Sequence, residues 1–378
     1  MIASDVPEHA HAGMRQLESP PLRTSFVSAI VSAALQAPSG DNCQPWRFRW
    51  DGRRLRVYFD PARAESFYDV DNRASWIALG AVLENMQLAA APLGLSLSIE
   101  LFPAAEVEPI VAVVTPQPST PVPMPLAEAI ETRCVNRRAY QRRPLPADVR
   151  ADIEAVVSAA PAAHLSWIDA PPAKKRLAAL AAENDRLLFE HRALHDGVYR
   201  WLRWTAAEAA KTGDGMPIAT LELHPLERPG FRLAAWWPFA RALAAIGASR
   251  AIPLRSRRVY ERSAAIALLT VDSSAREEFV RGGRLMQRIW LTATRHHVAF
   301  QPITGITFLL LRLSLLDGDG LSTRHRERLH RIADEAAVIL PKLNDAVPIM
   351  LFRLGVAAAP SARARRLPIN DVFTIDER

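Results

Sequence analysis

The residues with the clearest chemical potential follow an apolar segment early in the chain. Residues 36–50 read QAPSGDNCQPWRFRW, and their first part is typical of a turn. A turn alone requires neither amide side chains nor an indole at this spacing. The amides of Asn42 and Gln44 can both donate and accept hydrogen bonds, which suits a ligand with amide-like edges. This segment is therefore either an ordinary loop or one wall of a binding site.

Two arginine-rich segments offer the chemistry of anion binding. The first, RCVNR, spans residues 133–137, and the second, RARRLPINDVF, spans residues 363–373. A guanidinium group binds phosphate through two parallel hydrogen bonds, so Arg133, Arg365 and Arg366 are candidate phosphate ligands. Each segment taken alone is more typical of a solvated surface.

Four segments taken together resemble the nitroreductase-like flavoproteins. APSGDNCQPW is similar to the family's A-P-S-x-x-N-x-Q-P-W signature, and RCVNR to its Arg-x-Ser-x-Arg/Lys element. QPITG at 301–305 is similar to the loop that faces the flavin ring, and RARRLPINDVF to the C-terminal basic segment. Ordinary members have the Arg element first, whereas here it follows the Ala-Pro-Ser loop by about 95 residues. That order resembles the internally duplicated, Acg-type branch, in which one chain supplies both halves of a pseudo-dimer.

The resemblance implies an α+β, nitroreductase-like fold with FMN between the two halves. It implies oxidoreduction of a small planar or electron-poor substrate at flavin N5, with NADH or NADPH as an electron donor. No catalytic side chain and no metal is expected, because the flavin carries the chemistry. The implied cofactor-binding residues are Pro38, Ser39, Gly40, Asn42, Gln44, Arg133, Asn136, Arg137, Pro302, Ile303, Thr304, Gly305, Arg365 and Arg366.

The resemblance also gives some of these residues specific roles. A cation such as Arg137 near flavin N1 and O2 would raise the reduction potential of the flavin. A backbone N–H from Thr304 or Gly305 would face N5, where glycine permits a close approach. Trp46 is expected in the core rather than against the ring. Cys43 and Cys134 are expected to be small buried hydrophobes.

Two departures from the family pattern bear on affinity and stoichiometry. Val135 stands where the family usually has Ser or Thr, so one hydroxyl to the phosphate is missing. A second site would need an Arg element before the first half and an Ala-Pro-Ser loop in the second half. PPLRTSFV offers only Arg23, and VSAAPAAHLSW lacks the Asn, the Gln and the Pro-Trp pair of the Ala-Pro-Ser loop. One FMN per chain is therefore expected.

The elements that position these residues are predicted from hydrophobic periodicity and turn chemistry. Before residue 115, helical spacing covers 26–37 and 74–94, two strands flank an Asp51-Gly52 turn within 47–59, and a strand covers 110–115. Beyond it, helices are predicted over 125–133, 145–160, 173–210 and 275–300, and strands near 164–170, 262–272 and 347–355. The order helix, strand, long helix, strand occurs in both parts, which indicates a diverged internal duplication.

A proline-rich segment, TPQPSTPVPMP at 115–125, separates the two parts. It is predicted to form neither a helix nor a central strand and to act as a semi-rigid linker. The expected organisation is a first half at 1–115, a linker at 116–125 and a second half at 126–378. An insertion at about 212–239, rich in Gly, Pro and Trp, would serve as a lid or arm.

Composition and charge limit the kinds of partner that the chain is expected to bind. The formal net charge of +7 suits a polyanion, but the arginines are scattered and not interleaved with stacking aromatics, so nucleic acid is not expected. Apolar stretches such as 306–316 are shorter than the roughly 18 to 20 residues of a membrane span, so no membrane is expected. Residues 1–21 lack a basic region followed by an apolar one, which favours the cytoplasm. Two cysteines give neither a disulfide framework nor zinc spacing.

Two other functions compete with the oxidoreductase on the sequence alone. A lid formed by the insertion would shut the flavin away from electron donors, as in a flavin-sequestering or storage protein. A sequence pI of about 9.9 together with Val135 would instead suit a flavin-free, polyanion-binding scaffold.

Overall fold

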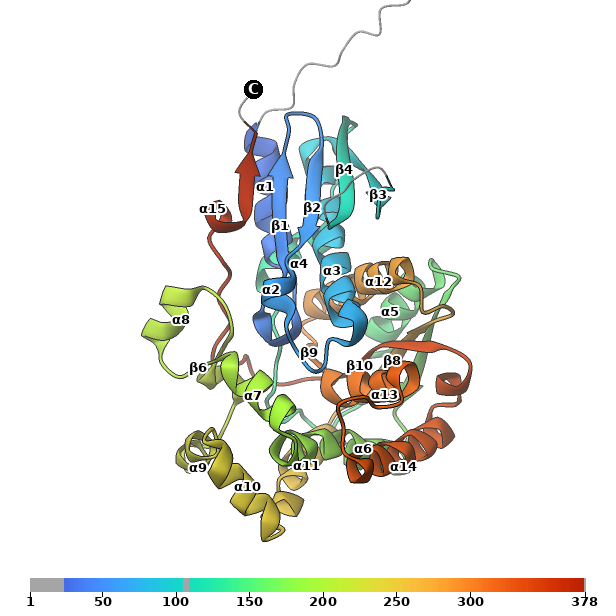
Figure 1. The fold of residues 1–378 in the computed structure, drawn as a ribbon. Coiled ribbons are helices and arrows are strands. Elements are labelled where there is room, and N and C mark those ends of the chain that lie inside the picture. The colour runs from blue at the N-terminus through green and yellow to red at the C-terminus, as the bar shows by residue number, and fades with distance from the viewer. Residues whose placement is uncertain (1–23, 105–108, 377–378) are drawn as a thin grey trace, which may run out of the picture.

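The computed structural model describes residues 24–104 and 109–376. Arg23 and the N-terminal segment 1–21 lie outside the described residues. Two main sheets and the helices around them account for most of the fold (Figure 1).

The two main sheets have the same strand order. In the first, β1 (Trp46–Trp50), β2 (Leu55–Phe59), β4 (Ile110–Pro118) and β3 (Leu95–Leu101) lie side by side in that order. In the second, the order is β5 (Ala163–Ile168), β8 (Ala265–Val271), β10 (Val347–Gly355) and β9 (Ala299–Pro302). Matching β1 with β5, β2 with β8, β4 with β10 and β3 with β9 aligns the two orders, and every neighbouring pair is antiparallel. The predicted α+β fold of two tandem halves is confirmed.

The helices follow the same correspondence. α1 (Thr24–Leu35) precedes β1 as α5 (Ala147–Ser158) precedes β5, and α3 (Arg73–Ala90) precedes β3 as α12 (Arg276–Arg295) precedes β9. The remaining helices are α2 (Pro61–Ala64), α4 (Pro125–Thr132), α6 (Pro171–Glu190), α7 (Arg192–Arg200), α8 (Ala206–Thr212), α9 (Arg228–Leu233), α10 (Trp237–Ala245), α11 (Pro253–Glu261), α13 (Thr304–Leu316), α14 (Thr323–Ile339) and α15 (Ile369–Val372). β6 (Leu202–Arg203) and β7 (Met216–Pro217) form a small separate parallel pair.

The two halves meet where α3 and α12 cross, and two glycines make the crossing close. A Cβ added at Gly80 would lie 2.1 Å from the carbonyl oxygen of Val280. A Cβ at Gly283 would lie 2.1 Å from the carbonyl oxygen of Ile77. Each glycine is the eighth residue of its helix, so the two occupy equivalent positions in the two halves. No other residue type fits at either position without moving the helices apart.

Buried polar groups fix how the two helices face each other. The Nε2 of Gln287 donates to the Oδ1 of Asn85 at 2.8 Å, and the Nδ2 of Asn85 donates to the carbonyl of Ala33. The buried carboxylate of Glu84 accepts hydrogen bonds from Arg284 and Arg288. A buried carboxylate must be paired, so this cluster allows only one relative placement of α3 and α12.

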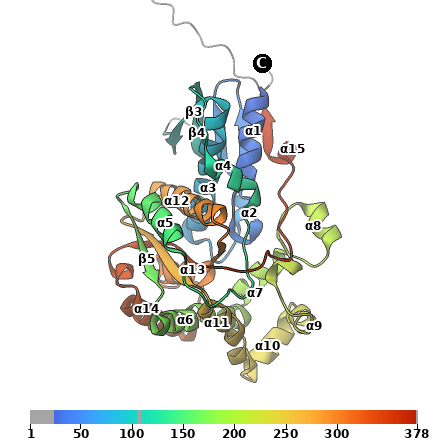
Figure 2. The ribbon, with the colours of Figure 1, turned by 180° about the vertical axis from the view of Figure 1, so that it is seen from behind.

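The end of the chain returns to the first half. β11 (Phe373–Ile375) pairs in parallel with β1, placing Phe373 opposite Phe48, and adds a fifth strand to the first sheet. From behind, the segment leading to β11 runs up beside the first half toward α15 (Figure 2). The basic segment that contains Arg366 is thereby carried past residues 36–44.

Three predicted boundaries differ from the structure. β4 extends through Pro118, because Pro116 and Pro118 pair only with the edge strand β3, beyond the last residue that pairs with β2. The predicted linker therefore begins with strand residues and ends with Pro125 inside α4. The helix predicted over 173–210 is broken into α6, α7 and α8, with β6 between α7 and α8.

The insertion is also larger than predicted. A tight turn joins β1 to β2, whereas α6 to α11 lie between β5 and β8. The expected lid at 212–239 is only the middle of this insertion.

Two kinds of feature are absent from the described residues. No helix there is long and apolar enough to cross a membrane. No group of three or more His, Cys, Asp or Glu residues within 24–104 and 109–376 is placed to hold a metal ion.

The helix crossing gives a first prediction. Gly80→Ala or Gly283→Ala should lower the free energy of unfolding by about 3 kcal/mol or more, because the added methyl group meets backbone that cannot rotate away. Urea unfolding followed by circular dichroism measures the loss. Gly197→Ala is the matched control, because Gly197 also lies in a helix and an added Cβ meets nothing within 4 Å. Equal stability of all three variants would contradict the close crossing.

Candidate functional site

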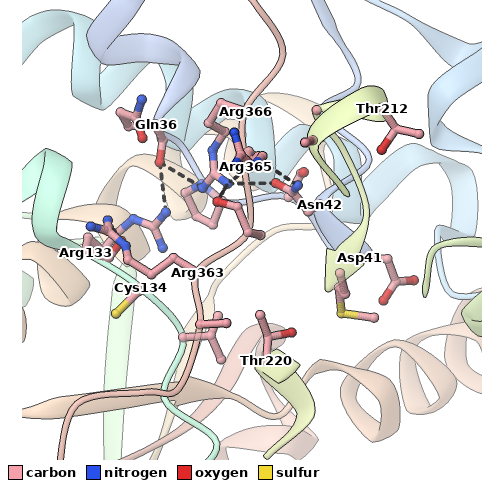
Figure 3. A pocket seen from close by; sticks show the side chains of 18 of the residues that line it. Gln36, Asp41, Asn42, Arg133, Cys134, Thr212, Thr220, Arg363, Arg365 and Arg366 are labelled. Carbon is pink, nitrogen blue, oxygen red and sulfur yellow. Dashed lines mark hydrogen bonds between the residues drawn. The ribbon is translucent and has the colours of Figure 1, made fainter. Parts of the chain in front are cut away.

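The predicted motifs meet at a cavity of about 690 Å³ between the two halves (Figure 3). Its first wall is the segment 36–42, from the first half. The second half provides the other walls, which are residues 131–137 from the last turn of α4 onward, residues 210–220 of the insertion and residues 362–371 near the end of the chain. This volume lies within the range of about 300 to 1,000 Å³ that is usual for small-molecule sites.

The backbone of the first wall explains its residue types. Asp41, Asn42 and Gln44 have φ values of 49°, 58° and 55°, in the left-handed region. Asp and Asn enter this region more readily than other non-glycine residues. The Oγ of Ser39 accepts a hydrogen bond from the backbone N–H of Gln44 at 2.9 Å. The segment is thus a compact, strained turn that its surroundings must hold in place.

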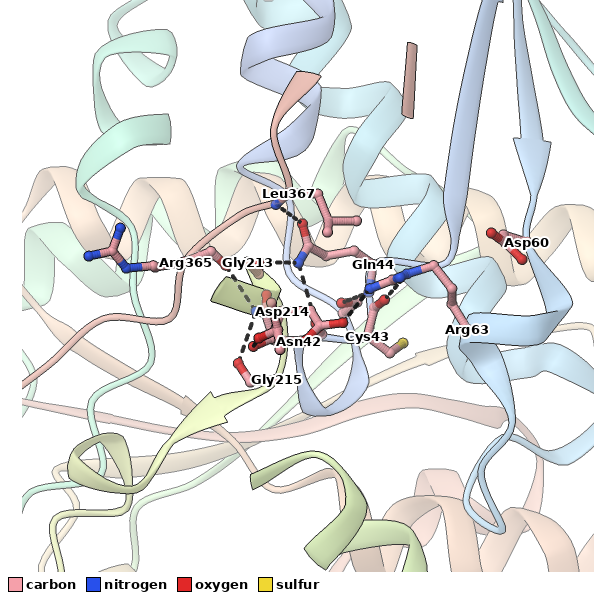
Figure 4. A network of polar contacts seen from close by, with 12 residues as sticks. Asn42, Cys43, Gln44, Asp60, Arg63, Gly213, Asp214, Gly215, Arg365 and Leu367 are labelled. Carbon is pink, nitrogen blue, oxygen red and sulfur yellow. Dashed lines mark hydrogen bonds and ion pairs between the residues drawn. The ribbon is translucent and has the colours of Figure 1, made fainter. Parts of the chain in front are cut away.

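The amides of Asn42 and Gln44 fasten this turn to the second half (Figure 4). The Nδ2 of Asn42 donates to the carbonyls of Gly215 and Arg365, at 3.0 and 2.9 Å. The Nε2 of Gln44 donates to the carbonyl of Gly213, and its Oε1 accepts from the backbone N–H of Leu367, at 3.0 and 2.9 Å. Sequence reasoning offered these amides to a ligand, but they are used within the protein because both are buried against crossing chain segments.

Arginines gather at one end of the cavity. The carbonyl of Gln36 accepts from Arg133 at 2.8 Å and from Arg366 at 3.3 Å, which draws the two guanidinium groups together (Figure 3). Arg133 also lies over the ring of Trp290, 4.4 Å from its centroid. The guanidinium of Arg363 donates to the carbonyls of Glu131 and Arg133.

The charge of these arginines is not neutralised. Among the described residues, no ion pair joins Arg133, Arg363 or Arg366 to a carboxylate, although Glu131 and Asp371 also line the cavity. The Nε atoms of Arg133 and Arg366 are buried without a partner in the described part of the chain. Burial, with Arg366 nearby, lowers the pKa of Arg133 well below its ordinary value. Burial, and then Arg363, lowers the pKa of Arg366 to about 10. An anion bound here would relieve the repulsion and satisfy the unpaired donors.

Arg137 also lines the cavity, and its charge interacts with that of Asp41. Its Nη1 donates to the carbonyl of Thr220 at 3.2 Å, and its Nη2 lies 3.5 Å from the Sδ of Met216, both in the insertion. Burial lowers the pKa of Arg137, and Asp41 opposes that shift. Burial raises the pKa of Asp41 to about 6 against the opposing effect of Arg137. This part of the cavity therefore holds a carboxyl group and a guanidinium group, whose charges are opposite when both are ionised.

A second cavity of about 160 Å³ shares Asp41 with the first. Thr304 and Gly305, the first two residues of α13, line it together with Gly40. The side chain of Asn184 covers Gly305, since a Cβ added there would lie 2.4 Å from its Nδ2. The Oδ1 of Asn184 in turn accepts a hydrogen bond from Tyr68 at 2.9 Å.

No family model matches this chain. The uncharacterized protein MT1398 of Mycobacterium tuberculosis is 27% identical over 341 residues, covering 89% of this chain but 46% of the relative. The chain thus spans about half the length of that relative. The putative NAD(P)H nitroreductase acg of M. tuberculosis is 24% identical over 359 residues, which is 93% of this chain and 96% of the relative. The chain is thus similar over nearly its whole length to a nitroreductase-like protein of the Acg type.

Solved structures give weaker matches. The FMN-dependent nitroreductase NfnB of Mycobacterium smegmatis, solved with NADPH, has a TM-score of 0.36 and 15% identity over 67% of this chain and 98% of its own. A nitroreductase with bound FMN from Desulfitobacterium hafniense has the same TM-score and 13% identity, over 68% of this chain and 100% of its own. Similarity at this level positions no residue.

The predicted site residues fall into three groups. The main cavity is lined by Pro38, Ser39, Asn42, Arg133, Arg137, Arg365 and Arg366. The second cavity is lined by Gly40, Thr304 and Gly305. Neither of these two cavities is lined by Gln44, Asn136, Pro302 or Ile303.

The predicted site residues that line neither cavity have structural roles instead, and Arg365 also differs from its predicted role. Ile303 is buried in the core beneath α13, and its N–H donates to the carbonyl of Leu351. Pro302 ends β9 opposite Phe352. The Nδ2 of Asn136 donates to the carbonyl of Ala358 at 2.9 Å, so this amide supports the basic C-terminal segment from behind. Arg365 lines the cavity but is exposed, and its carbonyl rather than its guanidinium holds Asn42.

The expectations for Trp46 and the cysteines are met in part. Trp46 is fully buried in the core, as predicted. Cys43 is buried, and its burial raises the pKa of its thiol to about 12, so it stays a neutral thiol. Cys134 is only half-buried and lines the cavity, since residue 134 lies on the wall between Arg133 and Arg137.

Sequence reasoning also missed a supporting residue, Arg353, in the middle of β10. It is fully buried and stacks on Tyr140, 3.7 Å from the ring centroid. Its guanidinium donates to the carbonyls of Asn136 and Arg138 and, at 2.7 Å, to the Oε1 of Gln301. Arg353 thereby ties the backbone around Arg137 to the strand that leads into α13. A charged residue inside the apolar run VPIMLFRLG was the available signal.

The fastening role of Gln44 gives a second prediction. In protein stripped of small molecules, Gln44→Ala should lower the free energy of unfolding by about 2 to 4 kcal/mol, because it opens a cavity and leaves the Gly213 carbonyl and Leu367 N–H unpaired. Gln141→Ala is the control, since the Gln141 side chain is exposed. A loss of stability seen only when a ligand is present would return Gln44 to a ligand-binding role.

Asp41 gives a third prediction, on pH. Its pKa is raised from 3.8 to about 6 on folding, so the folded state binds this proton more tightly than the unfolded state does. Ionisation of Asp41 therefore costs stability as the pH rises through about 4 to 6, and the cost is complete above that window. Asp41→Asn keeps the left-handed backbone and cannot ionise, so it should be stabilising at pH 8 and neutral near pH 4. Urea unfolding of both proteins across this range measures the difference, and a gain that does not vary with pH would refute the assignment.

Proposed function

We propose that this chain is an FMN-dependent oxidoreductase that binds one FMN between its halves and reduces a small planar or electron-poor molecule with electrons from NADH or NADPH. Bound FMN would supply hydride transfer at N5 of its ring. The observation that carries the proposal is the cluster of Arg133, Arg363 and Arg366, which lack a carboxylate partner among the described residues.

The cluster fits the phosphate of FMN. A phosphate dianion requires several fixed donors with positive charge, and the unpaired Nε atoms of Arg133 and Arg366 are donors of this kind. Arg363, which donates to the carbonyls of Glu131 and Arg133, adds a third guanidinium group to the lining of the cavity. The hydroxyl missing at Val135 is thus offset by a third arginine.

The residues toward Asp41 fit the ring less completely. Arg137 would stabilise negative charge on the reduced ring, and the backbone of Pro38 and Ser39 would meet its polar edge. The amides of Asn42 and Gln44 are already used, so they would support the ring only through the turn they hold. A ring edge placed at Gly305 requires the side chain of Asn184 to turn away.

The relatives support the choice of electron donor. The acg protein of M. tuberculosis is named a putative NAD(P)H nitroreductase, and so is the M. tuberculosis protein MT3217, which is 32% identical over 122 residues, 32% of this chain and 36% of its own. The same names support the class of substrate, because nitro compounds are small and electron-poor.

The phosphate assignment gives a fourth prediction. Wild-type protein should retain about one FMN per chain, as expected where only one motif set is present. Arg133→Ala and Arg366→Ala should each weaken FMN binding about tenfold to a hundredfold, because each loses a charge-assisted contact to phosphate. Fluorescence titration of the stripped protein measures both the affinity and the stoichiometry. Arg324→Ala removes the same charge from an exposed position on α14 and should change neither.

The outcomes separate the proposed function from its rivals. Bleaching of the flavin on anaerobic mixing with NADPH or NADH supports the oxidoreductase. Tightly bound FMN that neither donor reduces would indicate storage instead. Unchanged FMN affinity in both arginine variants, or no FMN binding by the wild type, would overturn the site.

A further inference from the structure

The positive charge of the chain is concentrated in one part of the insertion. Residues 226–260, here called the Arg-rich arm, contain α9, α10 and most of α11. The arm has seven arginines, no lysine and one acidic residue, Glu227, and its net charge of +6 is nearly the whole +7 of the chain. As the sequence indicates, arginines occur throughout the chain. Outside the Arg-rich arm, however, acidic residues nearly balance the positive charges, so the net charge is concentrated in the arm.

The same arm exposes large apolar side chains. The exposed fractions are 84% for Leu226, 63% for Trp236 and 79% for Ile246. Leu233 and Leu254 are 50% and 48% exposed. These five make up half of the large apolar side chains that are exposed in the described part of the chain. Such a group on a surface indicates an interaction.

The inner side of the arm is already packed, so the exposed side chains face outward. Ala234 and Ala240 form a small core with Phe189 of α6, and Phe231 and Trp237 pack against it. α9 and α10 project from the rest of the fold in both views (Figures 1 and 2).

Most arginines of the arm are available to a partner. Within residues 24–104 and 109–376, no ion pair involves Arg228, Arg232, Arg241 or Arg250. Arg255 pairs with Glu227 and Arg257 with Glu261, which leaves the remaining charges unopposed.

We propose that the Arg-rich arm docks on the surface of an anionic phospholipid bilayer. Arginines are attracted to the negative surface potential of such a bilayer, and exposed Trp, Leu and Ile side chains insert at the boundary between headgroups and acyl chains. Nucleic acid would satisfy the arginines but would leave aliphatic side chains such as Leu226 and Ile246 in water. A second copy of the chain would have to juxtapose two arms that are both strongly positive.

The arm is also connected to the cavity. Arg255 donates to the carbonyls of Leu221 and Glu222, next to Thr220 on the cavity wall. Docking would therefore hold the wall formed by the insertion close to the bilayer surface. The proposal itself depends only on the arm, and its failure would leave the FMN site untouched.

Flotation of the full-length protein with vesicles tests this. The protein should float with vesicles of phosphatidylcholine and phosphatidylglycerol at 3:1 in low salt, should bind pure phosphatidylcholine at least tenfold more weakly, and should be released by 0.5 M salt. Arg228→Gln with Arg241→Gln should weaken binding to the anionic vesicles about fivefold per charge. Trp236→Ser with Ile246→Ser should weaken it by about tenfold or more.

Matched variants outside the arm keep the test specific. Val338→Ser removes an apolar side chain that is 71% exposed on α14, and Arg324→Gln removes an exposed charge there, and both should bind like the wild type. No binding by the wild type, or equal loss in the control variants, would overturn the proposal. So would preferential binding of a DNA duplex, or a dimer in solution that Ile246→Ser converts to a monomer.

Discussion

The close crossing of α3 and α12 is the constraint on which the rest of the molecule depends. Gly80 and Gly283 let each helix touch the backbone of the other, and the buried Glu84 and Asn85 clusters fix the rotation of the pair. Each half contributes one helix and the sheet attached to it, so the crossing sets the distance between the two sheets. The cavity lies between lining segments that come from both halves, and the two sheets hold these segments in place.

The return of the chain end to the first sheet depends on this placement and completes the site. β11 pairs with β1, and on the way to it the backbone at Arg365 and Leu367 accepts and donates the hydrogen bonds of Asn42 and Gln44. The strained turn at 41–44 is therefore held by the second half of the chain. Neither half alone would keep the turn in shape, which is a physical reason for two tandem halves to share one cavity rather than form two.

Periodicity and turn chemistry predicted the elements that are determined by local sequence. They did not predict the features that are determined by tertiary contacts. The α3 and α12 helices, the hairpin of β1 and β2 and the duplicated order follow from local pattern. The strand residues Pro116 and Pro118 could not be predicted from local pattern. Proline has no N–H to donate, so it fits here only because β2 no longer pairs with β4 beyond Val114. Motif matching brought together Arg133, Arg137 and Arg366, but spacing cannot show which groups an amide bonds, so the roles of Gln44 and Asn136 required the fold. Arg363 and Asp41 lay within the motifs and were passed over, because neighbouring residues matched the family pattern better.

The hydrogen-bond partners of the arginines at and behind the cavity explain how the cavity keeps its charge. Arg133, Arg363 and Arg366 each donate to backbone carbonyls, at Gln36, Glu131 and Arg133, and Arg353 does the same at Asn136 and Arg138. A carbonyl dipole orients a guanidinium group and offsets part of its desolvation, yet leaves the full positive charge in place. A carboxylate would offset more and would also cancel the attraction for an incoming anion. Asp41, the acid whose charge interacts with that of Arg137, lies toward the second cavity, away from the arginine cluster. The uncompensated arginine charges at this end of the cavity thus lower the stability of the protein without a ligand. The same charges are those that a phosphate group requires.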